Sequence, residues 1–88
     1  MKLAVIGEPC MDYIHRGSHT TSKQFGGILY SLVSLAVISK GSATVYPVMN
    51  LGEDEYDNVT AFLISFGNID LSYINKTAQK TRVVNLFY

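Results

Sequence analysis

The segment QFGGILYSLVSLAVISKG, residues 24–41, decides the fold because two glycines stand directly before a long apolar run. Within that run, aliphatic residues recur at the spacing of one helical face, at Leu29, Leu32, Val33, Ala36 and Val37. Further aliphatic residues widen the face nearly all round, and Gly41 supplies a left-handed cap after the last turn. We therefore expect a helix that is buried on most of its sides.

Short β-rich segments lie on both sides of this helix. Residues 2–6 form an aliphatic run of the length of one buried strand, and residues 43–49 predict a second strand. Pro47 cannot donate a hydrogen bond to a strand ladder, which indicates an edge strand or an interrupted end. Residues 69–74 and 81–88 predict two further strands, joined by a polar connection.

A second helix and one long irregular segment complete the pattern. Apolar residues at helical spacing over residues 59–66 predict a helix that ends at Gly67. Asp54 and Asp57, near its start, match an N-cap and a first-turn acid. Residues 8–25 show no regular pattern and predict an irregular or partly extended excursion, which in a compact domain is usually functional or mobile.

The resulting order is strand, helix, strand, helix, strand, strand, which is typical of an α/β fold. Strands that alternate with helices predict a mainly parallel sheet with right-handed crossovers and helices on its faces. Such a sheet usually has more strands than this, and the chain ends within the aromatic run of residues 86–88. We therefore expect one domain, or part of one, with an open hydrophobic sheet edge through which a homo-oligomer could form.

Composition and charge exclude several classes of protein. Hydrophobic residues make up 48% of the chain and charged residues 16%, which excludes intrinsic disorder. Seven basic and seven acidic residues cancel without any basic cluster, so we expect neither nucleic acid nor an anionic membrane as a partner. The single cysteine, together with the lack of a secretion signal or a membrane-length apolar run, predicts a cytoplasmic protein.

Two features of the sequence are candidates for ligand binding. Asp12 follows the first predicted strand by a few residues, and in open α/β sheets ligands collect at the carboxyl ends of strands. Gly26 and Gly27 precede the first helix, where residues without a Cβ let an oxygen-rich ligand approach free backbone N–H groups. A surface acid and a tight turn into the helix are the alternative explanations, and the residues alone leave them open.

Other chemistry-bearing residues match no recurrent motif. The first strand is followed by neither the three glycines of a dinucleotide site nor a phosphate-binding loop. Cys10, His15 and His19 lack the spacing of a metal site, and no base lies near Cys10 in a recognisable nucleophile arrangement. The acids of residues 53–57 are explained by the helix dipole. We therefore predict no catalytic residue and no metal ligand in this chain.

Taken together, these segments resemble the N-terminal part of the PfkB (ribokinase-like) carbohydrate kinases. The stretch KLAVIGEPCMDYI, residues 2–14, is similar to the family's first strand, turn and aspartate. FGGILYSLVSLAVISKG resembles the Gly-Gly signature helix, VMNLGEDEYD the next strand with its Gly-x-Asp turn, and FGNIDLSYI the segment after the second helix. The resemblance implies a partial three-layer α/β/α fold, with residues 1–88 as the N-terminal, sugar-binding part of the domain.

The resemblance also implies roles for four residues. Asp12 would bind sugar hydroxyls, while Gly26 and Gly27 would form the turn that contacts substrate and lets a lid hinge. Ser31 stands where these kinases usually have a substrate-contacting asparagine. The interval from Asp12 to Gly26 is shorter than in ribokinase, so the β-lid is either reduced or supplied otherwise. ATP and Mg²⁺ are implied for the complete enzyme, but these residues do not include the family's Gly-Ala-Gly-Asp motif.

Two functional hypotheses follow. The first is the N-terminal fragment of an ATP-dependent sugar or nucleoside kinase, which contributes acceptor binding and holds no cofactor of its own. The second is a non-catalytic α/β module that self-associates or exchanges strands through its open sheet edge.

Overall fold

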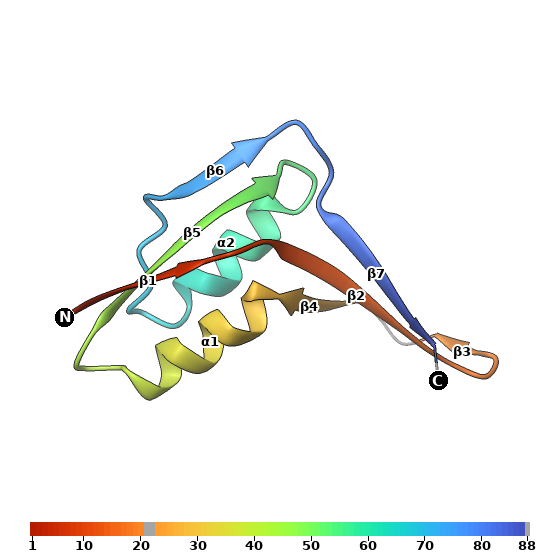
Figure 1. The fold of residues 1–88 in the computed structure, drawn as a ribbon, viewed down its shortest axis with the longest axis horizontal. Helices are drawn as coiled ribbons and strands as arrows, with labels where there is room; N and C mark the ends of the chain where they lie inside the picture. Colours follow the sequence, from red (N-terminus) through yellow and green to blue (C-terminus); the bar gives the residue numbers. More distant parts are fainter. Residues whose placement is uncertain (21–22, 88) are drawn as a thin grey trace.

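The computed structural model of the chain describes residues 1–20 and 23–87, which form two sheets and two helices. In chain order, the elements are β1 (Lys2–Ile6), β2 (Pro9–Arg16), β3 (His19–Thr20), β4 (Gln24–Gly27), α1 (Ile28–Ile38), β5 (Thr44–Gly52), α2 (Tyr56–Ile64), β6 (Ile74–Thr77) and β7 (Arg82–Phe87). Figure 1 shows the second sheet extending away from the layered α/β part of the molecule. The predicted mixed α/β fold with a mainly parallel sheet is confirmed.

The main sheet has the strand order β1-β5-β6, with parallel pairing at both contacts. Successive crossovers step across the sheet in the same direction, so right-handed connections put α1 and α2 on the same face. Alternate residues of β5 are buried on that face, at Val45, Pro47, Met49 and Leu51. The three aliphatic and methionine side chains of this set form one core with residues of both helices: Leu29, Leu32 and Ala36 of α1, and Val59 and Leu63 of α2.

No described helix covers the opposite face of the main sheet. Ala4, Tyr46, Val48 and Tyr73 line a shallow hollow of about 350 Å³ there, with Lys2 at its side. Of the three layers that the resemblance implies, the described residues therefore form two, the sheet and one layer of helices.

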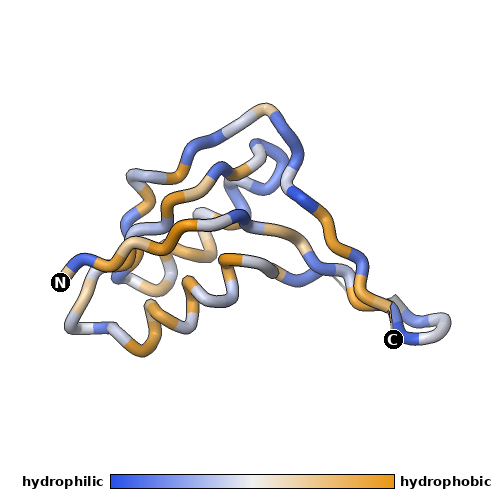
Figure 2. Tube along the Cα trace, viewed as in Figure 1, coloured by the Kyte–Doolittle hydropathy of each residue, from blue (hydrophilic) through white to orange (hydrophobic). Residues whose placement is uncertain are grey.

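Helix α1 follows Gly27 directly, as the Gly-Gly segment predicts, but its outer side is not buried. Tyr30 is 76% exposed and Ile38 82% exposed, because no described element lies against that side. Figure 2 shows hydrophobic residues along much of α1 and of β1. Ser39 is the C-cap, and a left-handed glycine usually follows the C-cap directly. The glycine with a positive φ, Gly41 at 86°, stands one residue later than that position.

Pro47 lies in the central strand, so the prediction of an edge strand is wrong, and the predicted interruption is found within the strand and not at its end. The backbone N–H of Thr44 donates toward β1, to Met1, whereas that of Val45 donates to Asn68 on the other side. The backbone nitrogen of Pro47 faces the same side of β5 as that of Val45. On that side, Val45 forms an isolated bridge with Ile69, and pairing with β6 begins only at Met49. The missing N–H therefore falls in a gap of the ladder.

Residues 8–25 are largely extended, which was one of the two predicted alternatives, and the irregular alternative is wrong. They contain β2, β3 and the first half of β4, and β2 is the central strand of a second sheet, with β4 antiparallel on one side and β7 parallel on the other. Pro9 is tolerated because it is the first residue of its strand. Met11 is 2% exposed and joins the core, which fixes this sheet to the helical layer.

The later part of the chain differs from the prediction in its boundaries. Helix α2 ends at Ile64, and turns carry the backbone on to Gly67. The strand β6 covers residues 74–77 instead of residues 69–74, and before Ile74 only the isolated bridge at Ile69 pairs with β5. Asp57 lies in the first turn of α2 as expected, but the N-cap is Glu55 and not Asp54. Neither helix is long and apolar enough to cross a membrane, as far as the described residues show.

Candidate functional site

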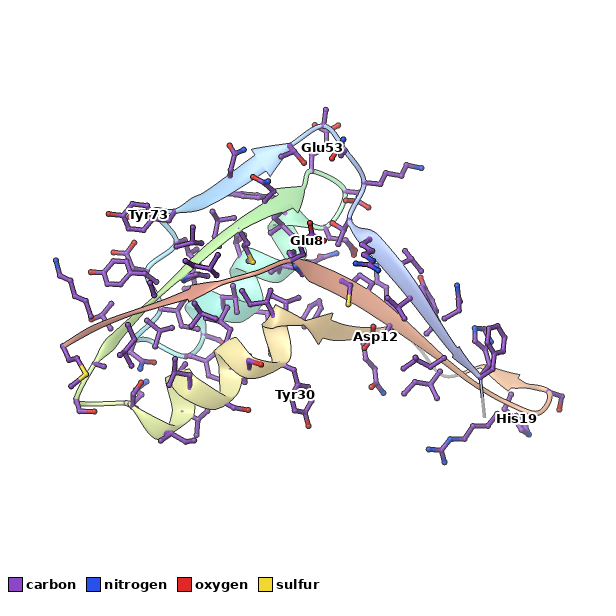
Figure 3. The ribbon with its side chains drawn as sticks, in the orientation of Figure 1. Glu8, Asp12, His19, Tyr30, Glu53 and Tyr73 are labelled. Carbon is purple, nitrogen blue, oxygen red and sulfur yellow. The ribbon has the colours of Figure 1, made fainter. Side chains whose placement is uncertain are left out.

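Asp12 and Gly26 lie against each other on neighbouring strands. In the β2–β4 ladder, Cys10 pairs with Gly26 and Asp12 pairs with Gln24. A Cβ placed on Gly26 would stand 2.2–2.5 Å from the three carboxylate atoms of Asp12, so the carboxylate rests directly on the glycine backbone. Figure 3 shows Asp12 beside β4, close to the start of α1. The structure therefore brings together two of the residues that the sequence singled out.

Gly27 adopts a conformation that needs glycine. It has a φ of 61° and a ψ of −137° and is the N-cap of α1, without a side-chain cap. A Cβ here would lie 2.7 Å from the carbonyl oxygen of Glu8 and 3.1 Å from Sγ of Cys10. The same Glu8 oxygen accepts a hydrogen bond from the backbone N–H of Ile28 at 3.1 Å, so the helix start is fastened to the β1–β2 connection.

Ser31 lies in the first turn of α1, where its side chain is exposed. Within residues 1–20 and 23–87, no hydrogen bond joins Ser31 to Asp12 or to the glycine pair. The structure therefore places Ser31 at the same helix start as the glycines, but as a separate exposed hydroxyl group.

Cys10 is the immediate neighbour of the Asp12 carboxylate. Its Sγ donates a hydrogen bond to Oδ1 of Asp12 at 3.3 Å, and the residue is buried. Burial raises the pKa of the Cys10 thiol, the hydrogen bond and the negative charge of Asp12 raise it further, and the positive charge of Arg82 opposes them. Cys10 is therefore a protonated donor that orients Asp12, and not an activated nucleophile.

Replacing Asp12 with asparagine should lower the pKa of Cys10, because it removes a negative charge and an anionic acceptor. The pH profile of iodoacetamide alkylation measures this, since Cys10 is the only cysteine in the chain. Alkylation of Asp12→Asn should begin at lower pH than that of the wild type. Glu8→Gln is the control, because Glu8 does not contribute to the shift. An unchanged pH profile of alkylation in Asp12→Asn would refute the hydrogen bond between Cys10 and Asp12.

A polar hollow of about 160 Å³ lies where the two sheets meet, at the carboxyl ends of the main-sheet strands. Its lining includes Glu8, Asn50, Lys80 and Arg82. Nη1 of Arg82 stands 3.7 Å from Oε2 of Glu8, and both side chains are largely exposed, so the pair adds little stability. These residues were not predicted from the sequence, although two basic residues separated by one position, directly before an apolar strand, were a usable signal.

His15 and the acidic run have structural contacts. Nε2 of His15 lies 3.0 Å from Oδ1 of Asn85, and the ring stacks on Phe87 at 4.5 Å. No three histidine, cysteine or acidic side chains among the described residues lie close enough together to hold a metal ion. Asp54 and Glu55, which the sequence analysis ascribed to the helix dipole, each bind a residue next to the second sheet.

No protein-family model and no curated protein matches the sequence. Solved structures do match: fructokinase from Halothermothrix orenii is 21% identical at a TM-score of 0.77, over 99% of this chain and 34% of the other. A nucleoside kinase from Methanocaldococcus jannaschii, described as an archaeal member of the ribokinase family, is 16% identical at a TM-score of 0.70. The match covers 98% of this chain and 32% of that kinase. A PfkB protein from Polaromonas sp. JS666 is 22% identical at a TM-score of 0.73, over 100% of this chain and 32% of the other.

These similarities define the fold. The chain has an α/β fold of the kind found in sugar and nucleoside kinases. More particularly, it has the ribokinase-like fold of the PfkB carbohydrate kinases, as the sequence resemblance predicted, and it spans about a third of the length of the chains it matches.

Proposed function

We propose that the chain is the N-terminal, acceptor-binding part of a cytoplasmic ATP-dependent carbohydrate kinase that acts on a sugar or a nucleoside. The observation that carries this proposal is the contact between the Asp12 carboxylate and the backbone of Gly26 at the start of α1. The ribokinase-like fold supports it, since the matched structures include a fructokinase and a nucleoside kinase.

The site suits a ligand with several hydroxyl groups. The Asp12 carboxylate can accept two hydrogen bonds from neighbouring hydroxyls, and bonds to an ionised acceptor are stronger than those between neutral groups. Gly26 lets the Asp12 carboxylate lie against β4, and the exposed Gly27 leaves backbone accessible to a ligand at the start of α1. Ser31 offers an exposed hydroxyl one turn into the helix.

ATP and Mg²⁺ belong to the proposed complete enzyme and not to these residues. The chain contains no phosphate-binding loop, and its described acidic side chains form no cluster suited to a metal ion. The residues present therefore do not fit a nucleotide or a magnesium site. In the proposed enzyme, phosphoryl transfer would depend on regions that correspond to the remaining two-thirds of the matched kinases.

Calorimetric titration of the chain with fructose, ribose and adenosine tests the proposal. At least one of them should bind, and Asp12→Asn should weaken that binding about tenfold, because a charged hydrogen bond is worth about 1.5–3 kcal/mol. Asp57→Asn is the matched control, since it removes an exposed acid in the first turn of α2. Equal affinities of the wild type and Asp12→Asn for every compound would contradict the role of Asp12.

A self-associating, non-catalytic module is the second candidate function, and two open strands favour it. β1 has one unpaired edge and exposes Ile6, and β7 is an edge strand that pairs only with β2 within the described chain. Exposed apolar edges of this kind promote pairing between copies. Light scattering during gel filtration distinguishes the two candidates, because a monomer at high concentration would argue against the module.

A further inference from the structure

Lys23 and Glu55 link the second sheet to the layered part of the molecule. Nζ of Lys23 donates to both carboxylate oxygens of Glu55, at 2.5 and 2.8 Å. The Glu55 side chain is only 6% exposed, whereas that of Lys23 is 44% exposed. The hydrogen bond to Glu55 raises the pKa of Lys23, against an opposing effect of desolvation, so the lysine stays charged. Loss of Lys23 would leave a buried carboxylate without a partner.

Asp54 makes a second link, one residue earlier in the same turn. Its Oδ1 accepts hydrogen bonds from the backbone N–H and from Oγ1 of Thr81, both at 3.0 Å. The backbone hydrogen bond from Thr81 lowers the pKa of Asp54, because it favours the ionised carboxylate. Beside it, the backbone N–H of Glu53 donates to the carbonyl oxygen of Thr77 at 2.8 Å.

The two linked residues occupy equivalent places in the second sheet. Lys23 directly precedes β4, and Thr81 directly precedes β7. β4 and β7 are the two strands that flank β2 at Asp12, which pairs with Gln24 on one side and with Val84 on the other. One turn, residues 52–55 (the β5–α2 turn), therefore fastens both neighbours of the strand that carries Asp12.

We propose that the β5–α2 turn positions Asp12 by holding the two strands on either side of β2, with Asp54 and Glu55 as positioning residues. Each link fixes one flank of the second sheet, and β2 itself enters through the short connection at Gly7 and Glu8. Loosening either flank lets the sheet shift relative to α1 and moves the carboxylate away from the helix start. The further step, from the position of Asp12 to acceptor affinity, rests on the proposed function.

Hydrogen exchange of the full chain, followed amide by amide, tests the two links separately. Lys23→Met should speed exchange about tenfold in β4 and β2 but not in β7, because a charged hydrogen bond to a nearly buried group is lost. Asp54→Ala should speed it in β7 and β2 but not in β4. Exchange in β1 and β5 should stay unchanged in both variants.

Matched variants separate positioning from a general loss of stability. Lys40→Met and Asp57→Ala remove a hydrogen-bonded lysine and an exposed acid away from the second sheet, and exchange in β2 should not respond to them. Lys23→Arg should restore the wild-type pattern. If Lys23→Met folds poorly, Lys23→Met with Glu55→Gln removes the link without leaving a buried charge.

The outcomes are distinct. Faster exchange confined to the second sheet would support the inference, and it would do so even if no sugar bound the wild type, a result that would remove only the proposed function. If a sugar binds, Lys23→Met should weaken it about threefold, less than Asp12→Asn, because Lys23 acts through the position of β2. Uniform acceleration across both sheets, or none in β2, would overturn the inference.

Discussion

Gly27→Ala should destabilise the chain by roughly 3–5 kcal/mol, a large part of the stability expected for a domain of this size. Two costs add at this residue. The backbone is held at a φ of 61° and a ψ of −137°, a region that side chains rarely adopt, at about 1–3 kcal/mol. The new Cβ would also lie 2.7 Å from the Glu8 carbonyl oxygen, a backbone atom that cannot move alone.

Gly17→Ala is the matched control for this change. Gly17 has almost the same φ, 59°, but a Cβ there would meet nothing within 4 Å. Its replacement should therefore cost only the conformational part, about 1–2 kcal/mol. Urea unfolding of the two variants gives both values. Equal losses of unfolding free energy at the two positions would show that the close approach of Gly27 to Glu8 contributes nothing to the cost. The inference that the helix start is tightly packed against Glu8 would then be wrong.

The features that could be predicted from sequence are those set by neighbours along the chain. The Gly-Gly pair and the aliphatic run after it specify the start of α1, since both act within a few residues. The contact between Asp12 and Gly26 could also have been predicted, because a strand that leads into a helix start must pass close to the end of β1.

The features that could not be predicted depend on partners far away in the sequence. β2 gains regular structure by pairing with other strands, above all β4 and β7, and its mixture of Pro9, charged and aromatic residues has no alternating pattern to recognise. Pro47 lies in a central strand because the partner ladder happens to be interrupted beside it. Asp54 and Glu55 resemble ordinary first-turn acids until Thr81 and Lys23 are placed beside them.

Gly52→Ala is the second change with a large expected effect, about 3 kcal/mol of lost stability. Gly52 has an ordinary φ, so the cost is entirely steric. An added Cβ would lie 2.4 Å from the carbonyl oxygen of Gln79 and 2.5 Å from both the backbone nitrogen of Thr81 and Oδ1 of Asp54. The methyl group would therefore force the connection to β7 away from the turn and break the hydrogen bonds between Asp54 and Thr81.

Thermal unfolding and hydrogen exchange together test this change, with Gly7→Ala as the control. A Cβ on Gly7 would meet only the Ile28 side chain, at 3.2 Å and beyond, so that variant should lose about 1 kcal/mol or less. In Gly52→Ala, exchange should rise in β7 even at temperatures where β1 and β5 remain protected, because the clash acts first on the β6–β7 connection. A loss no larger than that of Gly7→Ala would mean that the connection tolerates displacement, and the β5–α2 turn would then fasten β4 alone.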